Sequence, residues 1–168
     1  YTYLLKTYPQ TELRHKATTE MAELTFGAGQ FDEAIEQLID TLGKLKDPVV
    51  KEQTVYRLGT AYYSKGDFEK SAATFETFIQ EYPKSSLLGS ALFQAGESRM
   101  KAKEMKVAAE HFLAASKVIG LKPSLHESVL VRLGEVQGLT KQWPESAASY
   151  ALLLKSHPET KWQRHARF

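Results

Sequence analysis

The sequence predicts an all-α fold, an α-solenoid built from stacked antiparallel helix pairs. Three observations lead to this prediction: a short turn segment recurs along the chain, glycines recur at one phase before it, and proline-containing breaks recur after it. Between these landmarks the apolar residues have helical spacing, without the alternation expected of a strand. A single helix pair of this size cannot bury its apolar face alone, whereas stacked pairs bury a continuous core.

The turn segment occurs four times. Each copy has a turn residue, then a large apolar residue, and a small residue three positions after that. The copies begin at intervals of 37, 37 and 38 residues, at Gly29, Gly66, Lys103 and Lys141. Large aromatic residues recur in phase with these turns, and we expect them to pack in the core; they are Phe31, Phe68, Phe75, Phe112, Trp143 and Tyr150.

Glycine recurs at one phase of the helix that precedes each turn, at Gly59, Gly96 and Gly134. Because a helix-interior glycine costs about 1 kcal/mol relative to alanine, three at one phase need a reason. We expect another helix to cross there and to leave no room for a side chain. Prolines at Pro83 and Pro158 then mark the ends of helices, since proline does not continue a helix.

The apolar residues of the second copy form two stripes, one on each side of the turn. Both stripes follow the helical period, and they consist of Val55, Leu58, Gly59 and Tyr62, then Phe68, Ala72, Phe75 and Ile79. Each period is therefore predicted to be two amphipathic helices joined by a short turn.

Leu58-Gly59, Tyr62, Gly66, Phe68, Phe75 and Pro83 follow the order and spacing of one known repeat. The chain thus resembles the tetratricopeptide repeat (TPR) family, and the resemblance implies a right-handed superhelix. The third copy departs from the pattern, with Arg99 where an aromatic residue is usual. The period is longer than the family's 34 residues. With the link Tyr82-Pro83-Lys84-Ser85, it resembles bacterial cell-envelope TPR proteins, such as the Tol-Pal coordinator and outer-membrane assembly lipoproteins.

We expect one TPR array over residues 1–168, cut from a longer protein, because both ends match the interior of a repeat. The expected layout is the end of a preceding repeat at 1–10, four repeats at 11–48, 49–84, 85–122 and 123–159, and the start of a following repeat at 160–168.

Composition excludes several classes of function. The chain has 22 basic and 20 acidic residues and a net charge of +2, without the clustered basic footprint of a nucleic-acid-binding protein. Without cysteine it has no disulfide and no thiolate. No apolar run approaches the roughly 18 residues that span a bilayer, so we expect no membrane insertion of this segment. The resemblance favours the periplasm or cell envelope, with the cytoplasm as an alternative.

No motif for catalysis, a cofactor or a metal is present. The sequence lacks a Gly-rich phosphate loop, a nucleophile elbow and a His-Glu-x-x-His pattern, and no two of its five histidines are four residues apart. We therefore predict no catalytic, cofactor-binding or metal-binding residues, and a protein that is not an enzyme.

In the resembled family a partner binds on the concave surface, which the first helix of each pair lines. The residues carried over to this groove are Glu23, Phe26, Gln53, Tyr56, Thr60, Tyr63, Phe93, Glu97, Met100, Val131, Glu135 and Leu139. Such a surface suits an amphipathic helix or an extended peptide with some basic residues. The alternative is that its aromatic residues only complete the core between repeats.

We thus expect a non-catalytic scaffold that binds a peptide or helical segment of a partner protein. Two alternatives stay open. The chain could associate with itself through the ends of the array, or it could be the non-catalytic arm of a larger cell-envelope enzyme or assembly complex.

Overall fold

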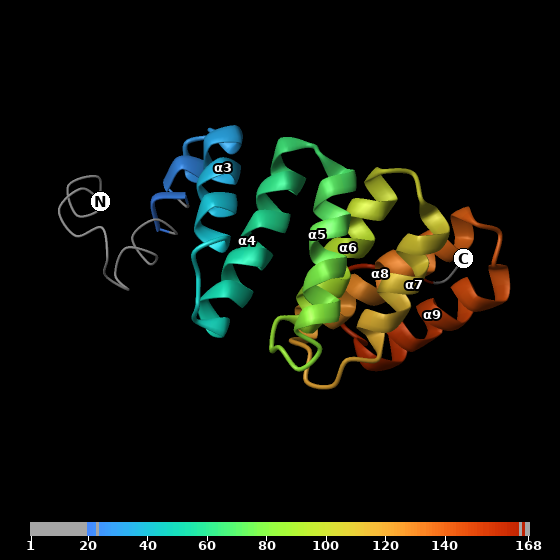
Figure 1. Cartoon of the computed structure of the whole chain (residues 1–168). Helices are drawn as coiled ribbons and strands as arrows, with labels where there is room; N and C mark the ends of the chain where they lie inside the picture. The colour runs from blue at the N-terminus through green and yellow to red at the C-terminus, as the bar shows by residue number, and fades with distance from the viewer. Residues whose placement is uncertain (1–19, 23, 165, 167–168) are drawn as a thin grey trace. The chain divides into compact units, whose positions relative to one another are not determined.

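The computed structural model describes residues 20–22, 24–164 and 166, and its helices are drawn in Figure 1. These residues form helices, turns and irregular links without a β-strand, which confirms the predicted all-α class. The chain divides into two compact units between Tyr82 and Pro83, and each unit is described by itself. The expected end of a preceding repeat, at 1–10, lies outside the described residues.

The first unit contains α3 (Phe31–Leu42), α4 (Pro48–Lys65) and α5 (Phe68–Glu81), and residues 20–22 and 24–27 are helical before them. Helix α4 starts where the Asp47 carboxylate accepts a hydrogen bond from the backbone N–H of Val49 at 2.8 Å, with proline in the first turn. It ends at Gly66, whose left-handed conformation (φ 89°) only glycine adopts without cost.

The core of the first unit confirms both apolar stripes of the second copy. On one side of α4, Leu58 and Ala61 pack in a buried cluster, whose other members are Ala22, Ile35 and Leu38. On the other side, the fully buried rings of Phe75 and Phe78 meet Tyr56 edge-on, with ring centroids 5.3 and 5.7 Å away. Helix α4 is thereby fixed between α3 and α5.

The second unit contains α6 (Leu88–Lys101), α7 (Met105–Ser116), α8 (Pro123–Leu139) and α9 (Trp143–Ser156). Helix α8 packs on α7 and on α9 (Figure 1). Leu133 of α8 faces Phe112 of α7 in one buried cluster, while Leu130 of α8 faces Leu153 of α9 in another. One helix thus joins the two halves of the core of this unit.

The recurring glycines lie where a ring of the paired helix touches the backbone. A Cβ atom on Gly59 would lie 2.8 Å from the Phe75 ring, and one on Gly134 would lie 2.7 Å from the Tyr150 ring. Gly96 meets the ring of Phe112 in the same way. The predicted helix crossing is therefore confirmed, and the group that occupies the space is an aromatic side chain.

Serine reinforces two of these crossings. The Ser71 hydroxyl donates to the carbonyl oxygen of Gly59 at 2.9 Å, and the Ser146 hydroxyl donates to that of Gly134 at 2.8 Å. Both serines are buried, so their hydrogen bonds satisfy groups that would otherwise be costly to bury. In the third copy the corresponding residue is the fully buried Ala108.

The four turn residues share one backbone conformation. Gly29, Gly66, Lys103 and Lys141 all have positive φ angles, of 79, 89, 67 and 63° respectively. Two of the four copies thus place a lysine where the chain needs the left-handed region, which L side chains adopt at a cost. The turn geometry is kept even where glycine is not.

Replacement of Gly134 by alanine should lower the free energy of unfolding by roughly 1–3 kcal/mol, because the new methyl group would overlap the Tyr150 ring. Gly138 on the same helix is the matched control: a Cβ there meets the Ser146 Oγ at 3.5 Å and a ring carbon of Trp143 at 3.9 Å, both ordinary contact distances. Gly138→Ala should therefore be neutral or stabilising by up to about 1 kcal/mol. Urea unfolding of both variants measures the difference, and equal losses would contradict the crossing contact.

Candidate partner-binding surface

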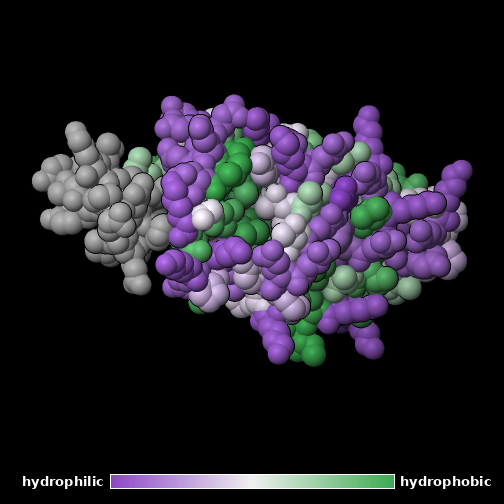
Figure 2. All heavy atoms as spheres, viewed as in Figure 1, coloured by the Kyte–Doolittle hydropathy of each residue, from purple (hydrophilic) through white to green (hydrophobic). Residues whose placement is uncertain are grey.

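In the first unit, three of the predicted groove residues line one cavity. Phe26, Tyr56 and Thr60 surround a space of about 310 Å³, together with Ala22, Leu38, Arg57 and Ala61. The Thr60 hydroxyl donates to the carbonyl oxygen of Tyr56 at 3.1 Å, so this polar group is already satisfied within α4. The walls are mainly apolar, and Figure 2 shows a hydrophobic strip over the region of α3 and α4 on a largely hydrophilic face.

The other predicted residues of the first unit do not line this cavity. Tyr63 is half-buried and meets Phe68 edge-on, with ring centroids 5.4 Å apart, which anchors the end of α4 to the start of α5. Gln53 is exposed on α4, and Glu23 lies outside the described residues.

In the second unit the predicted residues differ widely in exposure. Phe93 and Met100 are half-buried and pack against the cluster around Phe112. Val131 is only 3% exposed and belongs to the core, so it offers almost no surface to a partner. Leu139, at the end of α8, is 67% exposed.

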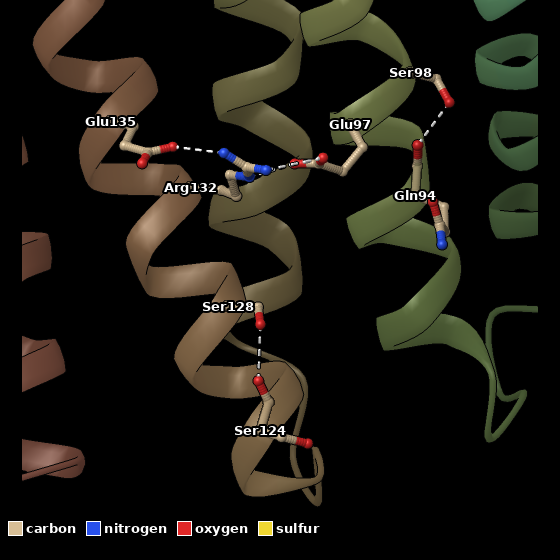
Figure 3. Close-up of polar contacts among 7 residues, drawn as sticks. All are labelled: Gln94, Glu97, Ser98, Ser124, Ser128, Arg132 and Glu135. Carbon is tan, nitrogen blue, oxygen red and sulfur yellow. Dashed lines mark hydrogen bonds and ion pairs between the residues drawn. The ribbon is translucent and has the colours of Figure 1, made fainter. Parts of the chain in front are cut away.

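Glu97 and Glu135 are brought together by Arg132, which the sequence did not indicate (Figure 3). The Arg132 Nε lies 2.8 Å from Oε1 of Glu97, and Nη1 donates to Oε2 of Glu135 at 2.9 Å. Burial raises the pKa of the Glu97 carboxyl, and Arg132 offsets this only in part. Arg132 and Glu135 are three residues apart, a spacing that could have suggested their pair, but Glu97 comes from α6 and only the fold places it here.

This network changes the charge of the predicted groove. The two carboxylates were expected to attract basic residues of a partner, yet Arg132 lies between them and neutralises much of their charge. In the second unit Glu97, Glu135 and Arg132 together carry one net negative charge when all three are ionised, compared with the two that the sequence alone suggested.

A wider groove of about 1040 Å³ lies along α8 and α9. Three predicted residues, Met100, Glu135 and Leu139, contribute to its wall. The rest of the wall comes mainly from α9, with Trp143 at one end. Trp143 is 64% exposed, so the expectation that it packs in the core is wrong. Among the described residues, no helix packs over it to enclose the indole.

Two histidines that are far apart in sequence meet at the start of α8. Nδ1 of His126 lies 2.9 Å from Nε2 of His157, the residue that follows α9. Burial lowers the pKa of His126, and the neighbouring His157 lowers it further. Among the described residues, no group of three or more histidine, aspartate or glutamate side chains is placed to hold a metal ion.

Paired helices whose crossings place a glycine against an aromatic ring define a TPR-type repeat protein. A family model described as YfiO, outer membrane lipoprotein, matches residues 20–168, and the chain therefore belongs to this family. The expected resemblance to bacterial cell-envelope TPR proteins is thus confirmed. No curated protein is significantly similar to the chain in sequence. In the described part of the chain, no helix has both the length and the apolarity to cross a bilayer.

Solved structures confirm the fold. MamA (residues 41 to the end) from Desulfovibrio magneticus RS-1 matches with a TM-score of 0.73 at 18% identity, over 90% of this chain and 81% of that one. A Podosopora anserina protein of kinesin light chain type, with nearly identical TPR-like repeats, matches with a TM-score of 0.72 at 15% identity, over 88% and 76%. At these identities the likeness establishes the TPR-like fold, which is typical of non-catalytic protein-interaction scaffolds.

Removal of Arg132 should destabilise the chain by roughly 2–3 kcal/mol, because Arg132→Ala leaves the buried Glu97 carboxylate without its cation. Glu97→Gln in the Arg132→Ala background should recover much of the loss, since a neutral amide costs less to bury. Urea unfolding of the single and double variants at pH 7.5 measures both effects. If the double variant lost as much stability as the sum of the single changes, the charge explanation would fail.

The histidine contact should make stability depend on pH. Because the folded pKa of His126 lies below the unfolded value of 6.5, the unfolded chain binds more protons at mildly acidic pH. The folding stability that depends on neutral His126 is fully present above pH 6.5. It should be lost as the pH falls through the lowered pKa of the folded state. The melting temperature of the wild type should therefore fall more steeply between pH 7.5 and 5.5 than that of His126→Gln. Parallel curves for the two chains would contradict the assignment.

Proposed function

We propose that this chain is a non-catalytic scaffold of the bacterial cell envelope that binds a peptide or helical segment of a partner protein. The partner segment binds on the face lined by the first helices of the repeats. The boundaries of these repeats are the ones expected from the sequence. Membership of an outer-membrane lipoprotein family supports the location, and a fold typical of interaction scaffolds supports the role. We propose a periplasmic location on the basis of the same family membership.

The observation that carries this proposal is the cavity beside α4. Its three predicted residues, Phe26, Tyr56 and Thr60, come from the first helices of two successive copies. The volume of about 310 Å³ is at the lower end for ligand pockets, so it suits one or two apolar side chains of a peptide better than a cofactor. Burial of one such side chain contributes about 1.5–3 kcal/mol.

Site-specific photo-crosslinking in intact cells of the source bacterium tests this proposal. A photoreactive residue at Gln53, on the predicted face, should give a discrete crosslinked protein. The same residue at Gln80, which is also exposed but lies on α5, should not. Thr60→Arg, which fills the cavity, should reduce the Gln53 product by about tenfold, a loss equal to one good contact.

Equal crosslinking from Gln53 and Gln80, or an unchanged product in Thr60→Arg, would overturn the proposed face. Circular dichroism of the Thr60→Arg chain checks that the variant is folded, since Thr60 is only half-buried.

A further inference from the structure

The link between α7 and α8 carries the most exposed large apolar side chain of the described residues. Ile119 is 98% exposed, whereas the other exposed large hydrophobic side chains lie between 43 and 67%. The link belongs to the interior of the second unit, with the pair α6–α7 before it and the pair α8–α9 after it. Such complete exposure of an isoleucine within a folded unit calls for a physical reason.

The rest of the link is fixed against α6. Leu121 occupies the space that Gly89 leaves free, since a Cβ on Gly89 would lie 2.1 Å from a methyl carbon of Leu121. Val118 lies beside the same glycine, and its N–H donates to the carbonyl oxygen of Ala115 at 3.1 Å. Leu121 and Val118 are both half-buried. The link therefore has a defined path, and of its three aliphatic side chains Ile119 is the one that projects into solvent.

Two lysines flank this exposed side chain. Lys117 and Lys122 are both exposed, and in the described part of the chain neither of them forms an ion pair. Gly120, next to Ile119, has a positive φ of 81°, which turns the chain at the tip of the link. The link thus presents one apolar tip between two cations that are not paired with a carboxylate.

The corresponding link of the first unit, between α3 and α4, differs in charge. It leads into Val49, which is 60% exposed. Its Lys44 is paired with Asp40 at 2.5 Å, and the Asp47 carboxylate caps α4. An exposed aliphatic residue therefore occurs in both links, but carboxylates accompany it only in the first. This difference provides a control within the same chain.

A tip of this shape suits a lipid bilayer better than a protein surface. A single projecting side chain offers little contact area to a rigid partner, whereas the fluid interface of a bilayer closes around it. Anionic headgroups attract nearby lysines, and the lysine stems lie along apolar surface while the ammonium groups stay in water. Membership of an outer-membrane lipoprotein family supports a bilayer as the surface concerned.

We propose that the α7–α8 link docks on a bilayer that contains anionic lipid, with Ile119 inserted at the headgroup boundary and with Lys117 and Lys122 at the phosphates. One side chain and two cations give a weak, reversible contact, so the link orients the chain on a membrane without anchoring it. The inference rests on the proposed cell-envelope location. It concerns residues outside the predicted partner-binding face, and it is tested in the absence of any partner protein.

Co-sedimentation of the full chain with vesicles of phosphatidylcholine and phosphatidylglycerol, in a three-to-one ratio, tests this proposal. The chain should sediment with these vesicles at low salt, and about tenfold less with pure phosphatidylcholine. Ile119→Ser should lower the partition coefficient at least about fivefold, because apolar burial is lost while the charge is unchanged. Lys117→Gln combined with Lys122→Gln should lower it about tenfold and remove most of its salt dependence.

Val49→Ser is the matched control, because it makes the same kind of change in the link of the first unit. Its partition coefficient should stay within about twofold of the parent. Thr60→Arg, which blocks the cavity under Proposed function, should bind vesicles at least as well as the parent, so the two proposals can fail separately. Ile119→Ser should keep the parental urea midpoint, since this side chain is almost fully exposed.

Three results would refute the docking of this link on a bilayer. They are no sedimentation with the anionic vesicles, equal losses in Ile119→Ser and Val49→Ser, and unchanged binding in the double lysine variant. A photoreactive residue at Ile119 adds a test in cells of the source bacterium. It should crosslink to lipid, and a discrete crosslinked protein in place of lipid would show that a protein occupies this surface.

Discussion

The close approach of an aromatic ring to a glycine backbone is the contact on which the rest of the structure depends. It occurs at Gly59, Gly96 and Gly134, each time between the first and second helix of a pair. Because the glycine has no side chain, the ring of the second helix lies directly against the backbone of the first, and this contact fixes where the two helices cross. The serine hydroxyl bonds to Gly59 and Gly134 then satisfy the backbone carbonyl groups at two of these crossings.

Once the pair is fixed, each helix has faces that the pair itself cannot cover. The next helix covers one of them, as α8 does for α7. This explains why half-buried residues such as Tyr56 both complete the core and line a cavity. Core packing and exposure to the cavity are therefore not alternatives for Tyr56, because its ring meets Phe75 and also lines the cavity.

The helices, their turns and their glycine crossings could be predicted because they depend on short-range patterns. Spacing, helix-breaking residues and the four turn positions are all visible within one repeat. The candidate site was predicted less well. Phe26, Tyr56 and Thr60 share a cavity, but Val131 is buried and the charges of Glu97 and Glu135 are compensated by Arg132. Exposure and ion pairing depend on which distant helix lies against a residue, and a single-repeat pattern carries no such information.

The sequence by itself determined the all-α class, the helix pairs and the family resemblance, because the same local pattern of apolar, turn and glycine positions occurs several times along the chain. Only the tertiary structure decided that Trp143 is exposed while Phe75 and Phe112, at recurring aromatic positions, are fully buried. It also decided that His126 meets His157 across 31 residues of chain. The physical reason is the same in both cases: burial and side-chain contact depend on which distant segment of the chain lies against a residue, and the local repeat pattern does not contain that information.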